Sequence, residues 1–183
     1  MDLHISYHTF GLIDGEDWPN EEPKDSNGLV AAYTAGAAVF TGIHSGKISV
    51  VVSALDTAPA QADLSRQWEE IVELSVAASS GHLVVRSFDH EPRLPLLSTS
   101  GPGRYRARVH AQGRDTDIDG TASRPVEFYL IQVWPAAFAE ETIHRQTDYY
   151  GATRRSAADA ALNRSKEPDG VTFEEWVDED DLG

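Results

Sequence analysis

Residues 103–111 read Gly-Arg-Tyr-Arg-Ala-Arg-Val-His-Ala, the clearest strand pattern in this chain of 183 residues. Apolar or small side chains alternate there with arginines and a histidine. A period of two with one apolar face predicts a strand with one side on a core and the other in water. We therefore expect a solvated arginine face formed by Arg104, Arg106 and Arg108. Cross-strand acids such as Glu70 or Glu127 are its expected partners, and an anion or acidic partner is the alternative.

Seven other segments have the β-branched and aromatic composition of strands: 3–10, 29–33, 37–43, 47–55, 70–77, 82–88 and 127–134. Clusters of Gly, Pro, Asp and Ser separate them. Two of these clusters, Ser45-Gly46 and Ser80-Gly81, are expected to be hairpin turns. Because no helix alternates with the strands, the pattern favours an all-β, antiparallel β-sandwich of about eight strands over a parallel α/β sheet.

The predicted organisation is a β-sandwich domain over residues 1–150, followed by a helical segment and an acidic tail over residues 151–183. Residues 152–164 are rich in alanine and other good helix formers, which predicts a short helix. The tail contains two aromatic residues, Phe173 and Trp176, in a strongly charged run. It is expected either to be a solvated end or to dock on a partner or on the body through these two rings.

The negative charge of the chain is concentrated in two blocks. The formal net charge is −15; residues 14–25 carry six acids against one lysine, and residues 167–183 carry eight acids and no base. Such a surface indicates a basic protein partner and no nucleic acid or membrane partner, because it repels phosphates. The candidate partner-binding residues of the first block are the carboxylates and the one possible aromatic anchor among them: Glu16, Asp17, Trp18, Glu21 and Glu22.

Few residues suggest chemistry. The chain lacks cysteine, a secretory signal pattern and an apolar run of membrane-spanning length, so we expect a cytoplasmic protein without disulfides. It also lacks a Gly-x-Ser-x-Gly elbow, a phosphate-binding loop and a His-Glu-x-x-His motif, so we expect no enzyme, no catalytic residue and no cofactor. His4 and His8 lie on one predicted strand, about 13 Å apart, too far to share a metal.

One loop partly matches a calcium-binding pattern. The oxygen ligands and the glycine that open such a loop have counterparts here: Asp115, Asp117, Asp119 and Gly120. Position 12, which should be glutamate, is Val126. A turn built from Asp and Gly is therefore the first expectation, and calcium binding stays open.

The hexapeptide Ile5-Ser6-Tyr7-His8-Thr9-Phe10 resembles the "ISYHxF" start of the competence protein J (ComJ) family of bacterial nuclease inhibitors. Later landmarks follow in similar order: Asp17-Trp18, an alanine-rich stretch over 31–38, a strand pair at 72–76 and 83–87, Gly103-Arg104-Tyr105 and Trp134-Pro135. The resemblance covers about residues 3–136. It implies a small β-sandwich that binds and inhibits a DNA-degrading enzyme. The segment 61–68 and everything after Ala136 depart from the family pattern.

The leading hypothesis is therefore a non-enzymatic inhibitor or immunity-type partner of a bacterial nuclease. Its acidic surface would cover the basic substrate groove and compete with DNA. The alternatives are a calcium- or small-ligand-binding β-sandwich module, or a structural or scaffold protein in a larger assembly. An enzyme is the third possibility.

Overall fold

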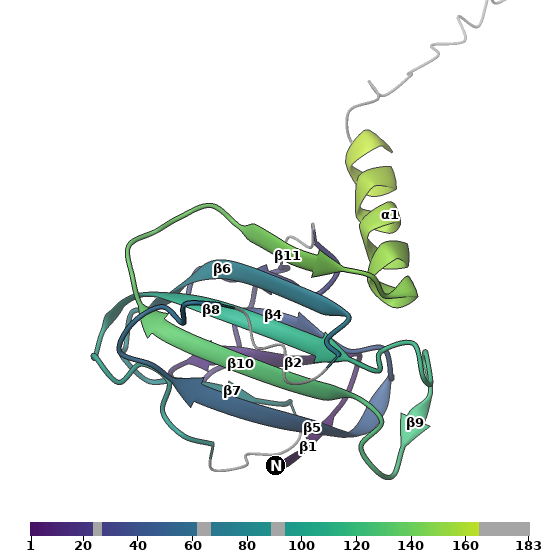
Figure 1. Cartoon of the computed structure of the whole chain (residues 1–183), viewed down its shortest axis with the longest axis horizontal. Coiled ribbons are helices and arrows are strands. Elements are labelled where there is room, and N and C mark those ends of the chain that lie inside the picture. Colours follow the sequence, from purple (N-terminus) through teal and green to yellow (C-terminus); the bar gives the residue numbers. More distant parts are fainter. Residues whose placement is uncertain (24–26, 62–66, 89–93, 165–183) are drawn as a thin grey trace, which may run out of the picture.

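The computed structural model describes residues 1–23, 27–61, 67–88 and 94–164. The protein is mostly β: two sheets lie face to face in a sandwich-like arrangement, and one helix stands at one end (Figure 1). The larger sheet contains, in spatial order, β1 (Asp2–Ile5), β5 (Ser45–Ala54), β10 (Phe128–Pro135), β8 (Gly103–Gln112), β6 (Glu70–Ala78) and β11 (Thr142–Gln146), with β9 (Thr121–Ala122) beside β5. The smaller sheet contains β3 (Val30–Ala32), β4 (Gly36–Phe40), β2 (Thr9–Asp14) and β7 (Leu83–Arg86).

The architecture differs from the prediction in strand number and direction. The described residues form eleven strands, and the pairs β5–β10 and β5–β9 are parallel, so the larger sheet is mixed. The predicted strand over 3–10 is two strands in different sheets, because the chain reverses after Ile5. His4 therefore lies on β1 and His8 in the turn that follows it, not on one strand.

The two predicted hairpins are wrong. The strands before and after Ser45-Gly46, β4 and β5, belong to different sheets, and so do β6 and β7 on either side of Ser80-Gly81. Both glycines do have the positive φ that the sequence suggested, 117° at Gly46 and 73° at Gly81. At Gly46, a Cβ would clash with the Ala122 carbonyl oxygen. Glycine therefore serves here to cross between sheets and to admit β9, and not to close a hairpin.

The apolar face of β8 forms part of the core, as its alternation predicts. Tyr105, Ala107 and Val109 are almost fully buried between the two sheets, among side chains of β2, β4, β5, β6 and β10. Their burial removes apolar surface from water, which is the main stabilising contribution in such a fold.

On the opposite face of β8, Arg104 is exposed as predicted, but Arg106 and Arg108 are buried, which contradicts a solvated stripe. Arg106 and Arg108 are 4% and 6% exposed and both bind the carboxylate of Glu73 on the neighbouring strand. Arg106 also donates to the Ala139 carbonyl, and the Arg108 guanidinium lies 5.4 Å from the Trp134 ring. Glu70 and Glu127, which were the predicted partners of these arginines, do not bind them. The two arginines thus tie β8 to β6 through Glu73, and Arg106 also ties β8 to Ala139 in the segment between β10 and β11.

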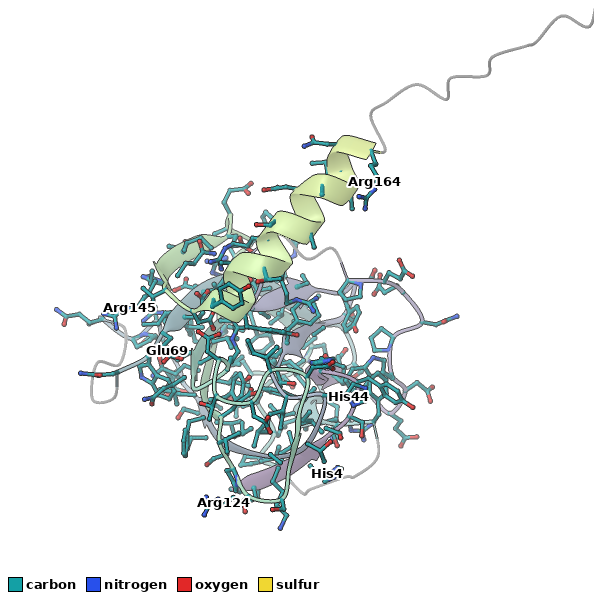
Figure 2. All side chains as sticks on the ribbon, turned by 90° about the vertical axis from the view of Figure 1, so that its right-hand side faces the viewer. His4, His44, Glu69, Arg124, Arg145 and Arg164 are labelled. Atoms are coloured by element: carbon teal, nitrogen blue, oxygen red, sulfur yellow. The ribbon has the colours of Figure 1, made fainter. Side chains whose placement is uncertain are left out.

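The helix α1 (Tyr149–Arg164) confirms the short C-terminal helix. Only Tyr150 and Gly151 in its first turn are buried, and it rises from the end of the sandwich with Arg164 at its far end (Figure 2). In the described residues, no helix has the length and apolar character needed to cross a membrane.

Candidate functional site

The turn between β1 and β2 has an unusual backbone. Its two central residues, Tyr7 and His8, have φ of 56° and 58°, and the Thr9 amide donates to the Ser6 carbonyl at 3.4 Å. Positive φ at both central positions is typical of a type I′ turn, where glycine, asparagine and aspartate dominate. A left-handed conformation costs about 1–2 kcal/mol for an ordinary L-residue. Strain of this kind persists only where the surroundings impose it, and it concentrates at functional sites.

Contacts of His8 hold this turn in place. Its backbone amide donates to the His44 carbonyl at 3.0 Å, and its carbonyl accepts from the Thr41 amide at 2.9 Å. Its ring Nε2 lies 3.1 Å from Asp119 Oδ1 and its Nδ1 lies 3.3 Å from the Thr41 carbonyl oxygen. Because His8 is fixed on both its backbone and its ring, the side chain of Tyr7 is directed outwards, where 71% of it is exposed.

Tyr7 belongs to a connected group of rings, which we call the aromatic surface: Tyr7, Trp18, His44 and Phe88. The Tyr7 ring lies edge-on to His44 at 5.6 Å and to Phe88 at 6.5 Å between centroids. The Trp18 and Phe88 rings lie 4.0 Å apart. Phe88 is 46% exposed. Trp18 and His44 are half-buried, so Tyr7 and Phe88 are the exposed members of the cluster. Exposed aromatic rings packed on one another are typical of protein–protein binding sites.

The acidic residues of segment 14–23 differ in what their carboxylates bind. Two of them accept hydrogen bonds from other parts of the protein, and the others are described below. Asp14 accepts bonds from Ser80 and His82; burial raises the pKa of its carboxyl, but these bonds outweigh that effect and lower the pKa overall. Glu21 accepts from the Thr34 amide at 2.7 Å and from its hydroxyl at 2.9 Å. Both carboxylates therefore fix the path of the loop.

The remaining predicted partner-binding residues differ in their placement. Glu16, Asp17 and Glu22 are exposed and form no side-chain hydrogen bond or ion pair within the described residues. Trp18 is half-buried on Phe88, so it is part of a cluster and not a projecting anchor. The structure thus joins the stretch 16–18 to the aromatic surface and turns Glu21 towards Thr34. Phe173 and Trp176 lie outside the described residues.

A buried ion pair anchors the helix at the end of the sandwich. Arg114 is fully buried and donates from Nε and Nη2 to the two oxygens of Asp148, at 2.6 and 2.9 Å. Its Nη1 donates to the Gly28 carbonyl at 2.7 Å. Asp148 also accepts the Gly151 amide at 2.8 Å, so the same carboxylate caps the helix. This pair links β8, the segment before β3 and α1.

Two further carboxylates are buried near this pair. Glu70, on β6, lies 3.3 Å from Arg155; burial and the neighbouring Asp148 raise its pKa from 4.5 to about 7. Burial also raises the pKa of Glu127, although bonds from the Tyr129 hydroxyl and the Ile43 amide oppose this. Sequence reasoning placed both residues as surface partners of the arginines on β8 and missed this buried cluster.

We expect the Glu70→Gln variant to have a flatter dependence of stability on pH. The raised pKa means that the folded state holds the Glu70 proton more tightly than the unfolded state. The resulting stability is complete below pH 4.5 and is lost as the pH rises through about 7. Relative to the parent, Glu70→Gln should therefore gain stability between pH 5 and pH 8 in urea unfolding. The exposed Glu140→Gln control should show no such gain. If Glu70→Gln and the parent differed by the same free energy of unfolding at pH 5 and at pH 8, the raised pKa of Glu70 would be contradicted.

The aspartates of the calcium-like loop serve different partners. Asp115 accepts the backbone amides of Tyr149 and Tyr150, both at 2.8 Å, and so caps the start of α1 together with Asp148. Asp119, which itself has φ of 62°, binds His8. Among the described residues, no group of three or more His, Cys, Asp or Glu side chains is arranged to hold a metal ion. Two of the three carboxylates that the pattern would need are thus directed at other groups.

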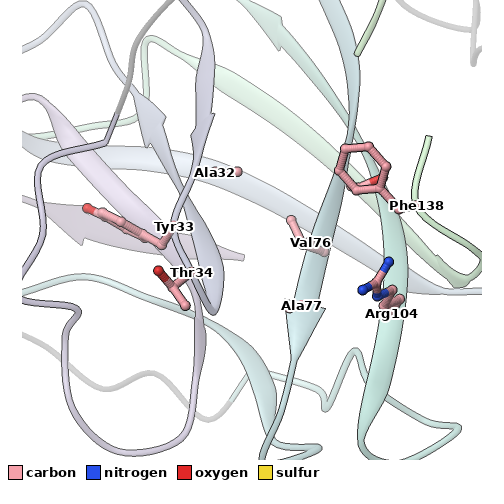
Figure 3. A pocket seen from close by; sticks show the side chains of 8 residues that line it. Ala32, Tyr33, Thr34, Val76, Ala77, Arg104 and Phe138 are labelled. Carbon is pink, nitrogen blue, oxygen red and sulfur yellow. The ribbon is translucent and has the colours of Figure 1, made fainter. Parts of the chain in front are cut away.

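A separate pocket of about 260 Å³ lies between β3 and β6, and we call it the edge pocket. Tyr33 and Thr34 lie on one side of it and Val76, Arg104 and Phe138 on the other (Figure 3). Its lining is mostly apolar, and Arg104 is its charged residue. Nothing in the sequence indicated this pocket, because its walls come from four segments far apart in the chain.

No family model, no curated protein and no solved structure matches this chain. The resemblance to the competence protein J family therefore stays a prediction that rests on its hexapeptide. The four central residues of that hexapeptide, Ser6 to Thr9, are those of the strained turn.

Proposed function

We propose that this protein is a non-enzymatic binding protein that inhibits or neutralises a basic bacterial nuclease through the aromatic surface and the carboxylates beside it. The observation that supports the proposal most is the strained turn that holds Tyr7 exposed against His44 and Phe88. Exposed aromatic side chains in a cluster are the residues that most often dominate binding energy at protein interfaces. A turn without a binding role would be more stable with glycine at this position.

Charge supports a basic partner. Glu16 and Asp17 precede Trp18 in sequence and are free to pair, and the Glu16 carbonyl accepts from Arg86 on β7, the strand that leads to Phe88. The net charge of −15 would speed the approach of a cationic protein and slow that of DNA. A nuclease is the class of basic protein that the sequence resemblance implies, since it must hold phosphates in a positive groove.

The proposal predicts salt-sensitive inhibition of DNA cleavage. Purified protein should be added to the nucleases encoded beside its gene, and cleavage of a labelled duplex should be followed with increasing protein. We expect stoichiometric inhibition that weakens between 0.05 and 0.5 M salt, because long-range attraction is screened. The Glu16→Lys, Asp17→Lys double variant should inhibit less. Uninhibited cleavage, with no complex by calorimetry, would remove the nuclease assignment.

A further inference from the structure

The edge pocket has two walls that the protein itself holds in place. On one wall, the Thr34 amide and hydroxyl donate to the Glu21 carboxylate at 2.7 and 2.9 Å. On the other, the Ser75 hydroxyl donates to the Ala139 carbonyl and accepts from its amide, both at 3.0 Å, next to Phe138 at the pocket. Hydrogen bonds to neighbouring segments therefore fix both walls, and the pocket is formed before any ligand enters it.

Arg104 is the polar side chain of this pocket that other residues leave unoccupied. The Ser75 and Thr34 hydroxyls are bound as described above. The Tyr33 hydroxyl is directed away from the opposite wall (Figure 3) and has a side-chain hydrogen bond with Trp18. Arg104 is exposed and forms no side-chain hydrogen bond or ion pair within the described residues. Polar recognition in this pocket therefore depends on its guanidinium.

Strand register explains why Arg104 differs from the next two arginines of β8. Arg106 and Arg108 both bind the carboxylate of Glu73. Arg104 lies opposite Ala77 on β6, whose methyl group offers no counter-charge. Arg104 thus places a positive charge beside an apolar cavity, in a chain with 30 acids and 15 Lys and Arg. Because this charge is exposed, a ligand can pair with it without the cost of burying an ion.

Apolar groups form most of the remaining lining. Val76 and the rings of Tyr33 and Phe138 border the cavity, and 63% of Phe138 is exposed. A ligand that covers this ring removes apolar surface from water. A volume of about 260 Å³ lies just below the usual range of small-molecule sites, which limits the ligand to about one ring. The body of the fitting ligand is therefore a single aromatic ring, which can pack against both aromatic side chains.

Arg104 determines the charged group of that ligand. A carboxylate matches the fork of the guanidinium and accepts two hydrogen bonds from it. A phosphate could do the same, but the net charge of −15 opposes a dianion more strongly than a monoanion. We propose that the edge pocket binds a small aromatic monocarboxylate, with its ring between Tyr33 and Phe138 and its carboxylate on Arg104.

This site is independent of the surface proposed to bind a nuclease. The edge pocket and the aromatic surface have no residue in common. The two ligands also differ in kind, since one is a small acid and the other a basic protein. Carboxylate binding can therefore be present where nuclease inhibition is absent, and the reverse.

The test is calorimetric titration of the full chain with phenylacetate. We expect one site per chain. Phenylacetamide keeps the ring without the charge, and acetate keeps the charge without the ring. Each should bind at least about tenfold more weakly than phenylacetate. Phenyl phosphate should also bind more weakly, because its second charge is repelled.

Two substitutions locate the site. Arg104→Gln should weaken the binding of phenylacetate by about tenfold or more, and Phe138→Ser should weaken it by removing one of the two rings. Arg124→Gln, which changes an exposed arginine between β9 and β10, is the matched control and should leave the affinity unchanged. Circular dichroism should confirm that each variant is folded, as expected for exposed positions.

Three results would overturn the proposal: no heat of binding up to about 10 mM phenylacetate, equal affinity for phenylacetamide, or an affinity that Arg104→Gln does not change. Tighter binding of phenyl phosphate than of phenylacetate would overturn the choice of a carboxylate.

Discussion

Replacing Asp148 with alanine is expected to lower the free energy of unfolding by about 3–5 kcal/mol, because it leaves a buried guanidinium without its counter-charge. Arg114 and Asp148 are both buried, and two charge-assisted hydrogen bonds join them. The same substitution removes the cap of the Gly151 amide, and loss of a cap typically costs about 1 kcal/mol. Urea unfolding followed by circular dichroism gives the measurement.

Companion variants separate the charge from the cap. Asp148→Asn keeps an oxygen that can accept from Gly151 but removes the charge. Its free energy of unfolding should therefore fall by most of the amount expected for Asp148→Ala. Adding Arg114→Met to Asp148→Asn should recover much of the stability, since a buried apolar side chain needs no counter-charge. Asp159→Ala on the exposed part of α1 should change little. If the loss in free energy of unfolding of the double variant equalled the sum of the losses of the two single variants, the two residues would not act as a pair.

The buried ion pair between Arg114 and Asp148 could not be predicted from the sequence. The strands were visible because the side chains of the two faces differ in polarity, which leaves a period of two in the sequence, as in β8. Arg114 and Asp148 are 34 positions apart, and nothing in the composition around either residue marks it as buried. The same limit explains why Glu73 and not Glu70 binds the arginines of β8: the choice depends on which face of β6 each carboxylate takes. Register decides that, and it is set by pairing across strands.

Turns were harder to interpret than strands for a related reason. Glycine at Gly46 and Gly81 signals positive φ, but the same backbone serves a hairpin and a crossover between sheets. Conversely, Tyr7-His8 contains no turn residue, so the segment was predicted as continuous strand. The hexapeptide around it contains no glycine, proline, asparagine or aspartate that would signal the positive φ of this turn. The aromatic surface then follows from the fold, because its rings come from four separate segments.

We expect Tyr7→Gly to change stability and binding in opposite directions. Glycine adopts φ of 56° without a clash, so the variant should be more stable in urea unfolding by about 0.5–1 kcal/mol, after the entropy that glycine loses on folding. The same variant removes the exposed ring at the centre of the aromatic surface. Binding of the nuclease identified by the inhibition assay should therefore weaken by about 2 kcal/mol or more, roughly 30-fold in dissociation constant.

Controls distinguish this trade-off from a general effect of surface change. Tyr7→Phe keeps the ring and the strain, so it should leave stability unchanged and most of the binding intact. Ile143→Ala removes an exposed apolar side chain on β11, at the opposite edge of the larger sheet from β1, and should not alter binding. A gain in stability with undiminished binding would show that the turn is strained for a reason other than partner recognition. A loss of stability in Tyr7→Gly would show that the left-handed backbone at Tyr7 stores no strain, because glycine then gives no relief.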